Sequence, residues 1–122
     1  MRELTNIEVI KAIPFDPVFK QKLLSNYQKY NEGQQYEIAR LCWKAFHQMR
    51  RLLTDWKNEE FLREVAEGKK TITPTFNQEV AEAVWQDIEN MISGKMQEQQ
   101  KIEAIRLHLQ DIISSQKLTV ND

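Results

Sequence analysis

The stretch IARLCWKAFHQMRRLLTDW, from Ile38 to Trp56, decides the fold that this sequence predicts. Its apolar residues recur at alternating steps of three and four, which is the spacing of one face of an α-helix. At about 100° per residue they cover roughly 160° of arc, as expected for a helix buried against two neighbours. The pattern predicts a helix over about residues 32–57. The apolar positions are Ile38, Ala39, Leu41, Cys42, Ala45, Phe46, Met49, Leu52, Leu53 and Trp56.

Both ends of this long helix carry recognisable signals. Asn31 followed three residues later by Gln34 is typical of a capping box that starts a helix. Beyond Trp56 the sequence allows two interpretations. Residues 58–60 either begin a short separate helix that ends near Gly68, or they continue the long one. Gly68 suits the left-handed conformation that follows a helix end in both cases.

Two shorter helices precede the long one. Thr5 and Glu8 form a capping-box pair, which predicts a helix over about residues 5–13 that Pro14 ends. Asp16 followed by Pro17 is a second start signal, because aspartate caps a helix and proline loses nothing at the first helical position. This second helix is expected to extend to about Tyr30.

The C-terminal half predicts a helical hairpin. A helix begins near Thr73 or Thr75, and Gly94 favours a break before a last helix. One continuous helix of about 40 residues is the alternative, because the same helical phase continues past Gly94. Polar residues would then occupy its apolar face for nearly two turns, so we favour the hairpin. The apolar face of its first helix comprises Phe76, Val80, Ala83, Val84, Ile88, Met91 and Ile92.

The composition predicts an all-α protein. Three Gly and 3 Pro in 122 residues leave few places for the tight turns that a β-sheet requires. We expect a small bundle of about four to five helices, with the long helix at its centre. Residues 1–118 would form a single domain, and residues 119–122 a polar tail.

Composition also excludes several protein classes. The formal net charge of -1 and the 41% apolar content are unlike those of a disordered chain. Apolar runs are far shorter than the roughly 20 residues of a membrane span, and the acidic residues Glu3 and Glu8 do not fit a secretory signal. We therefore expect a cytoplasmic protein without a membrane partner.

The residues needed for catalysis or metal binding are not spaced for it. His47 and His108 are too far apart to form a zinc-binding pair on one helix, and the glycines do not form a phosphate-binding loop. Cys42 lies on the apolar face of the long helix, where a buried thiol packs as a small hydrophobe. The acids between Glu59 and Glu67 have the spacing of a solvated helix face. We expect no enzymatic activity, no cofactor and no metal, and a partly buried structural role for His108.

The opposite face of the long helix is unusual because it is basic and contains a tryptophan. Basic side chains recur there at helical spacing, and no acid lies between Arg40 and Arg51. Arginine and aromatic residues are enriched at recognition surfaces. This set, which we call the basic face, comprises Arg40, Trp43, Lys44, His47, Arg50 and Arg51.

Three explanations of the basic face are open. In the first, Trp43 packs on another helix of the chain, such as the first, and the cations pair with the acids of residues 59–67. In the second, the basic face binds an acidic surface of a protein partner or of a second copy of this chain. In the third, it binds the backbone of a nucleic acid, with Trp43 stacked on a base.

The distribution of charge bears on these explanations. Residues 1–57 hold 10 basic and 6 acidic side chains, whereas residues 58–122 hold 7 basic and 12 acidic ones. The two parts therefore carry net charges of +4 and -5. This asymmetry favours intramolecular pairing or self-association, because nucleic-acid-binding domains usually carry a net positive charge.

A second surface is predicted on the helix that follows Thr75. Trp85, Ile92 and Met96 lie along one edge of its apolar arc and make that arc wider than a simple hairpin can bury. Either the short helices at 5–13 and 59–67 cover this edge, or it is a self-association seam.

Together these patterns predict a non-enzymatic interaction or assembly module. It would bind a protein partner, or itself, through the basic face. The alternative is binding of a nucleic acid or another polyanion through the same residues.

Overall fold

The computed structural model describes residues 3–95 and 99–115, the last six of them by their backbone alone. This part of the chain contains helices and loops and no strand, so the predicted all-α class is confirmed. The helices are α1 (Asn6–Ala12), α2 (Pro17–Asn26), α3 (Glu32–Ala66), α4 (Phe76–Ile92) and α5 (Gln99–Ser115). A short 3₁₀ turn, η1 (Tyr27–Lys29), joins α2 to the loop before α3.

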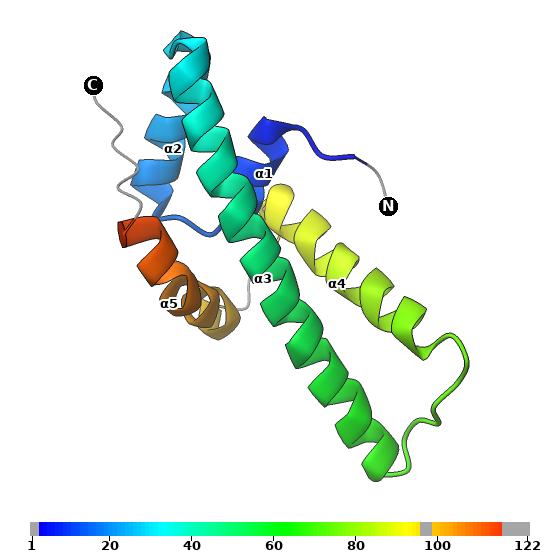
Figure 1. Ribbon diagram of the computed structural model, residues 1–122. Coiled ribbons are helices and arrows are strands. Elements are labelled where there is room, and N and C mark those ends of the chain that lie inside the picture. The colour runs from blue at the N-terminus through cyan, green and yellow to red at the C-terminus, as the bar shows by residue number, and fades with distance from the viewer. Residues whose placement is uncertain (1–2, 96–98, 116–122) are drawn as a thin grey trace.

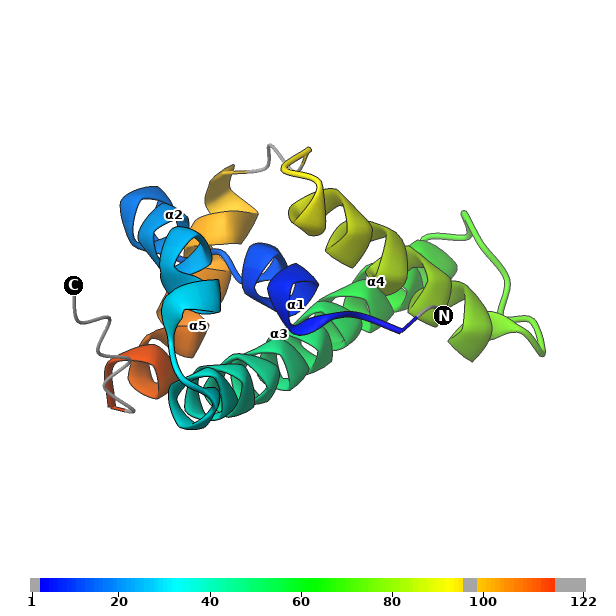
Figure 2. The ribbon, with the colours of Figure 1, turned by 90° about the horizontal axis from the view of Figure 1, so that it is seen from above.

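The long helix α3 organises the bundle. It runs along the whole molecule, with α4 on one side and α2 and α5 on the other (Figure 1). Helix α1 lies between these two sides, on the face of α3 that is turned away from the viewer in Figure 1, as the view from above shows (Figure 2). One face of α3 is therefore left without any helix over it.

The predicted starts of the first three helices are confirmed. At α1, Glu8 N–H donates to Thr5 Oγ1 and Thr5 N–H donates to Glu8 Oε1. Asp16 accepts from two backbone N–H groups at the start of α2. Asn31 and Gln34 form the same reciprocal pair at α3. Each cap satisfies N–H groups that lack a partner inside the helix.

Helix α3 is longer than the predicted range of 32–57. It continues without a break to Ala66, so the interpretation with a separate helix at 59–67 is wrong. The last turns stay helical because Phe61 is buried and packs edge-on against Phe76 of α4, with 6.0 Å between ring centroids. The helix ends at Ala66, and Gly68 follows this end as predicted, with a left-handed φ of 77°.

Helix α1 is short, yet it forms the centre of the hydrophobic core. Val9, Ile10 and Ala12 are completely buried, and α1 packs on both α3 and α4. Complete burial of a valine or isoleucine side chain such as Val9 or Ile10 contributes roughly 1.5–3 kcal/mol. The core opposite α1 is formed by the predicted apolar face of α3, including Met49 and Leu53.

The predicted break at Gly94 is confirmed, because α4 ends at Ile92 and Gly94 has a φ of 74°. The two helices of the hairpin do not pack along each other. They diverge from the turn, and each packs mainly on α3 (Figure 2). Near the turn they are linked by the ion pair between Lys101 and Asp87, at 3.3 Å.

Helix α5 is held on the other side of the bundle by its buried residues Ile105 and Leu109. Arg106 also fastens it to the linker between α1 and α2. Its Nε donates to Pro14 O at 2.6 Å and its Nη2 donates to Phe15 O at 3.2 Å. The predicted tail at 119–122 lies outside the described residues. None of the helices in the described part combines the length and apolar character needed to cross a bilayer.

Candidate functional site

The outer face of α3 carries most of the basic face and is open to solvent. It is turned toward the viewer in Figure 1, and no other helix crosses it. Lys44, His47 and Arg51 are exposed there. Across residues 3–95 and 99–109, no carboxylate forms an ion pair with any of the three. The charges of Lys44 and Arg51 are therefore available to an external group.

Arg40 differs from these cations because it has a partner in its own helix. Its Nη2 lies 3.0 Å from Glu37 Oε2, and both side chains are largely exposed. An exposed pair at this spacing contributes only ~0.3–0.5 kcal/mol. Arg40 is thus partly neutralised at little gain in stability.

Trp43 does not stand on the open surface with the cations. Its Nε1 donates to Asn6 Oδ1 of α1 at 2.8 Å, and its ring packs edge-on against Phe46. The side chain is partly buried against the core. This is the packing on the first helix that the intramolecular explanation predicted for Trp43.

The other half of that explanation is wrong, because the acids of residues 59–67 do not pair with the basic face. Three of them pair with nearby lysines instead. These ion pairs are Lys57–Glu60, Lys70–Glu64 and Lys69–Glu67, at 3.4, 3.3 and 2.9 Å. Glu59 lies in the same helix as Arg51, ~12 Å further along the axis at 1.5 Å per residue.

A groove of about 290 Å³ runs between α3 and α4, beside the open face. It brings together Arg50 of the basic face and Trp85 of the predicted seam, which the sequence placed on separate surfaces. Helical periodicity orders the residues of one helix and does not say which two helices lie side by side. The groove is lined by Arg50, Thr54, Asn58, Asn77, Val80, Ala81, Val84, Trp85 and Ile88.

Most polar side chains of this groove form no hydrogen bond with the described residues. The Thr54 hydroxyl donates to the carbonyl of Arg50 at 2.8 Å. The side chains of Arg50, Asn58 and Asn77 form no hydrogen bond with the described part of the protein, and neither does the indole N–H of Trp85. Sequence reasoning missed the two asparagines, because a lone asparagine on a polar helix face gives no signal.

The structure describes only part of the predicted seam. Trp85 and Ile92 are half-buried and pack against the core, whereas Met96 lies outside the described residues. Helix α1 and the end of α3 pack on α4, as expected if these elements cover its apolar arc. Self-association through Trp85, Ile92 and Met96 stays a prediction.

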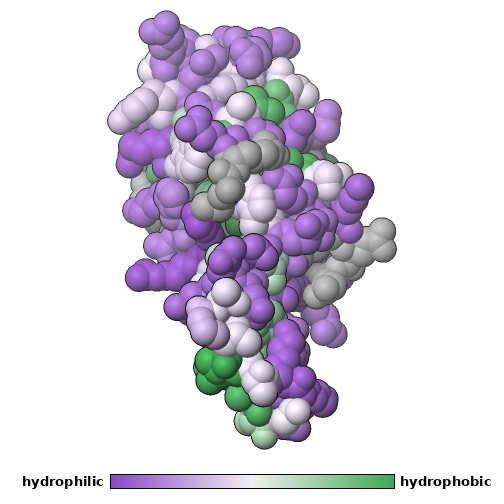
Figure 3. Space-filling view, turned by 90° about the vertical axis from the view of Figure 1, so that its right-hand side faces the viewer, coloured by the Kyte–Doolittle hydropathy of each residue, from purple (hydrophilic) through white to green (hydrophobic). Residues whose placement is uncertain are grey.

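Exposed apolar side chains gather at the end of the α3–α4 pair. Leu62 and Ile72 are 50% and 63% exposed. Hydrophobic surface is visible there at the lower end of the molecule (Figure 3). Beside it, Lys70 Nζ lies 3.6 Å from the centroid of the Phe61 ring, a cation–π contact that covers this aromatic side chain.

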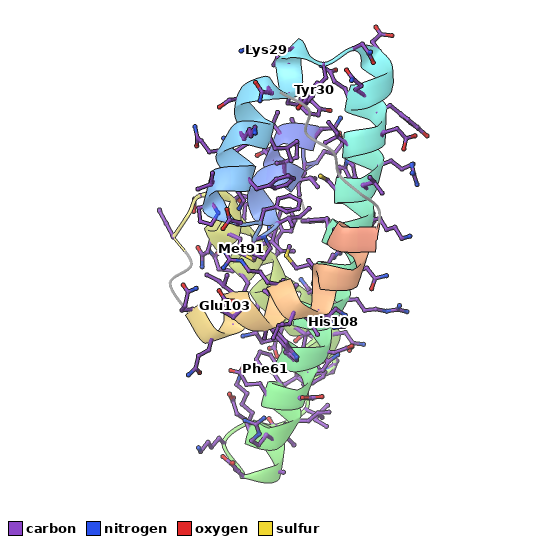
Figure 4. All side chains as sticks on the ribbon, turned by 90° about the vertical axis from the view of Figure 1, so that its left-hand side faces the viewer. Lys29, Tyr30, Phe61, Met91, Glu103 and His108 are labelled. Carbon is purple, nitrogen blue, oxygen red and sulfur yellow. The ribbon has the colours of Figure 1, made fainter. Side chains whose placement is uncertain are left out.

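The remaining reactive side chains have simple surroundings. Cys42 is buried, and burial raises the pKa of its thiol to about 12. His108 is exposed on α5, so its expected partial burial is wrong (Figure 4). No group of three or more His, Cys, Asp or Glu side chains could hold a metal ion in the part of the chain that the structure describes.

Comparison with known proteins adds no assignment. No family model, curated protein or solved structure matches this chain. The surface of α3 and the groove beside it are therefore the basis for a functional proposal.

Proposed function

We propose that this protein is a non-enzymatic helical module that binds an acidic segment of a protein partner. The segment would lie on the outer face of α3, with one apolar side chain in the α3–α4 groove. The observation that supports this most is the exposure of Lys44, His47 and Arg51 without ion-pair partners in the described residues, directly beside a groove that contains Arg50 and Trp85.

The charges have the spacing needed to bind a segment that follows the helix. Lys44, His47 and Arg51 are three and four residues apart, so they span ~10 Å along one side of α3. Acidic side chains of a partner would meet two permanent cations over that length. Complementary charge of this kind mainly accelerates association and fixes orientation.

The groove provides the apolar contact and the specificity. Ala81 and Trp85 form an apolar wall, and the amides of Asn58 and Asn77 offer both donors and acceptors to a peptide backbone. Its volume of about 290 Å³ lies just below the ~300–1,000 Å³ of typical small-molecule sites. It fits one large side chain of a partner better than a cofactor.

An NMR titration tests this proposal. The probe is a synthetic peptide of glutamates with one central phenylalanine, added to the isotopically labelled protein. We expect shifts at residues 44–58 and 77–85. The double variant Lys44→Glu/Arg51→Glu should weaken binding at least tenfold. The control Lys29→Glu/Lys95→Glu, with the same change in net charge, should not.

A groove variant and a second probe separate this proposal from polyanion binding. Ala81 is exposed, so Ala81→Phe should fill the groove without unfolding the protein and should abolish the phenylalanine-dependent part of the affinity. A single-stranded oligodeoxynucleotide is the second probe. If it binds more tightly than the peptide, with an affinity that falls steeply with salt, the partner is a nucleic acid and the proposal is wrong.

A further inference from the structure

A second, smaller pocket lies on the far side of the molecule, where four helices meet. It has a volume of about 180 Å³. The linker from α1 to α2, the end of α4 and the start of α5 surround it, and Met91 and Glu103 mark this region in Figure 4. Its lining residues are Ala12, Pro14, Phe15, Pro17, Lys20, Met91, Gly94, Ile102 and Arg106.

The lining combines an apolar interior with two cations. Lys20 comes from α2 and Arg106 from α5, while α1 and α4 contribute only Ala12 and Met91. Lys20 Nζ donates to the carbonyl of Lys11 at 3.0 Å. No described carboxylate forms an ion pair with Lys20. Arg106 Nη1 donates to Glu103 at 2.6 Å, so one acid partly neutralises the two cations that line the pocket.

Both cations keep donors for a ligand. Lysine has three N–H donors and arginine has five. Lys20 uses one of its donors on Lys11, and Arg106 uses one each on Pro14, Phe15 and Glu103. Two N–H groups on each side chain are thus left to bind an anion. The backbone carbonyls hold both side chains in place before any ligand arrives, which lowers the entropic cost of binding.

The positive charges of Lys20 and Arg106 also repel each other. Burial, and to a lesser extent the charge of Arg106, lowers the pKa of Lys20 from 10.5 to about 8. An anion beside both groups would relieve this unfavourable arrangement. Its binding should therefore favour the charged form of Lys20.

We propose that this pocket binds a small aliphatic monocarboxylate. The carboxylate accepts hydrogen bonds from Lys20 and Arg106. The hydrocarbon chain lies among Phe15, Met91 and Ile102. A volume of about 180 Å³ equals about six water molecules at ~30 Å³ each. It therefore suits a chain of about five or six carbon atoms.

Calorimetric titration of the full chain with hexanoate tests this proposal. In the series acetate, butanoate and hexanoate, we expect the affinity to rise about fourfold for each added CH₂. Longer chains should gain nothing further once the pocket is full. Affinity should fall with pH above about 8, as Lys20 loses its proton. Hexanol, which lacks the charge, should bind at least tenfold more weakly than hexanoate.

Variants complete the test. Lys20→Met keeps the apolar stem and should lower hexanoate affinity at least tenfold, whereas Lys29→Met, at an exposed position, should not change it. Four results would overturn the proposal: no binding of hexanoate, equal affinity of Lys20→Met, equal affinity for acetate and hexanoate, or equal affinity for hexanol and hexanoate. Equal binding of hexanol would show an apolar pocket without a role for the two cations.

Discussion

Trp43 ties α1 to α3, because its indole donates to Asn6 and its ring packs on Phe46. The sequence leaves open whether a tryptophan on an otherwise charged helix face packs on another helix or is exposed to a partner. Here α1 packs at the edge of that face and partly buries the ring. Trp43 therefore has a structural role, and the binding proposal rests on the exposed cations beside it.

The first prediction follows from this packing. Trp43→Ala should lower the free energy of unfolding by about 2 kcal/mol, somewhat less than the ~3–5 kcal/mol typical of a core aromatic. Tyr36, another aromatic residue of α3, is 66% exposed. Tyr36→Ala should change stability by less than about 0.5 kcal/mol. Urea unfolding of both variants provides the comparison. Equal losses would mean that α1 does not cover Trp43.

Lys20 gives a pH-dependent prediction. Its pKa is lowered to about 8 in the folded protein, so between pH 8 and 10.5 the unfolded chain binds more protons. The contribution of Lys20 to stability therefore rises with pH across that window. Lys20→Met should raise the free energy of unfolding by about 1 kcal/mol at pH 7, allowing for solvent screening. Urea unfolding at pH 7 and pH 10 should show most of this gain disappearing. A gain that is the same at both pH values would contradict the prediction.

At the scale of the elements, the continuity of α3 is the main result. Two interpretations of residues 58–60 were open from the sequence, and they assign different positions to Glu59. In a separate helix capped by Asn58, Glu59 would be the first helical residue, where proline is tolerated. In the continuous helix it is an interior residue.

Proline substitution distinguishes these two positions. Glu59→Pro should cost about 3 kcal/mol, because it removes a backbone hydrogen bond inside α3. Glu32→Pro, at the first residue of α3, should be nearly neutral. Far-UV circular dichroism and urea unfolding measure both effects. A well-tolerated Glu59→Pro would indicate two helices.

Substitution of two glycines by alanine should have opposite effects on stability, because one follows a helix end and the other lies inside a helix. Gly94 has a φ of 74°, so Gly94→Ala should cost about 1–2 kcal/mol even though nothing lies near the added Cβ. Gly33 is helical, and a Cβ there would make an ordinary contact with Asn31 Oδ1 at 3.4 Å. Gly33→Ala should therefore stabilise α3 by about 0.5–1 kcal/mol. Thermal unfolding checks both signs.

For the molecule as a whole, the packing is uneven along α3. Its middle is covered by α1, α4 and α5, whereas only α4 lies beside its lower end (Figure 1). Opening of that end breaks fewer buried contacts. Hydrogen exchange should therefore be faster at the amides of residues 58–66 than at those of 41–53. Equal protection along the helix would contradict this expectation.

Local signals predicted the elements better than their arrangement. The capping pairs at Thr5 and Asn31 and the break at Gly94 were readable because each depends on a few neighbouring residues. The groove could not be predicted from the sequence, because Arg50 and Trp85 meet only when α3 and α4 pack together. The same holds for Trp43, whose cover comes from a helix that is distant in the sequence.

The hydrogen bonds from Arg106 to Pro14 and Phe15 also constrain how the protein is made. They join residues that are more than ninety positions apart in the chain. A ribosome therefore releases α1 and α2 long before their partner on α5 exists. Contacts of such long range form late, so the nascent N-terminal helices wait without their final cover. These native contacts can form only after α5 has been synthesised.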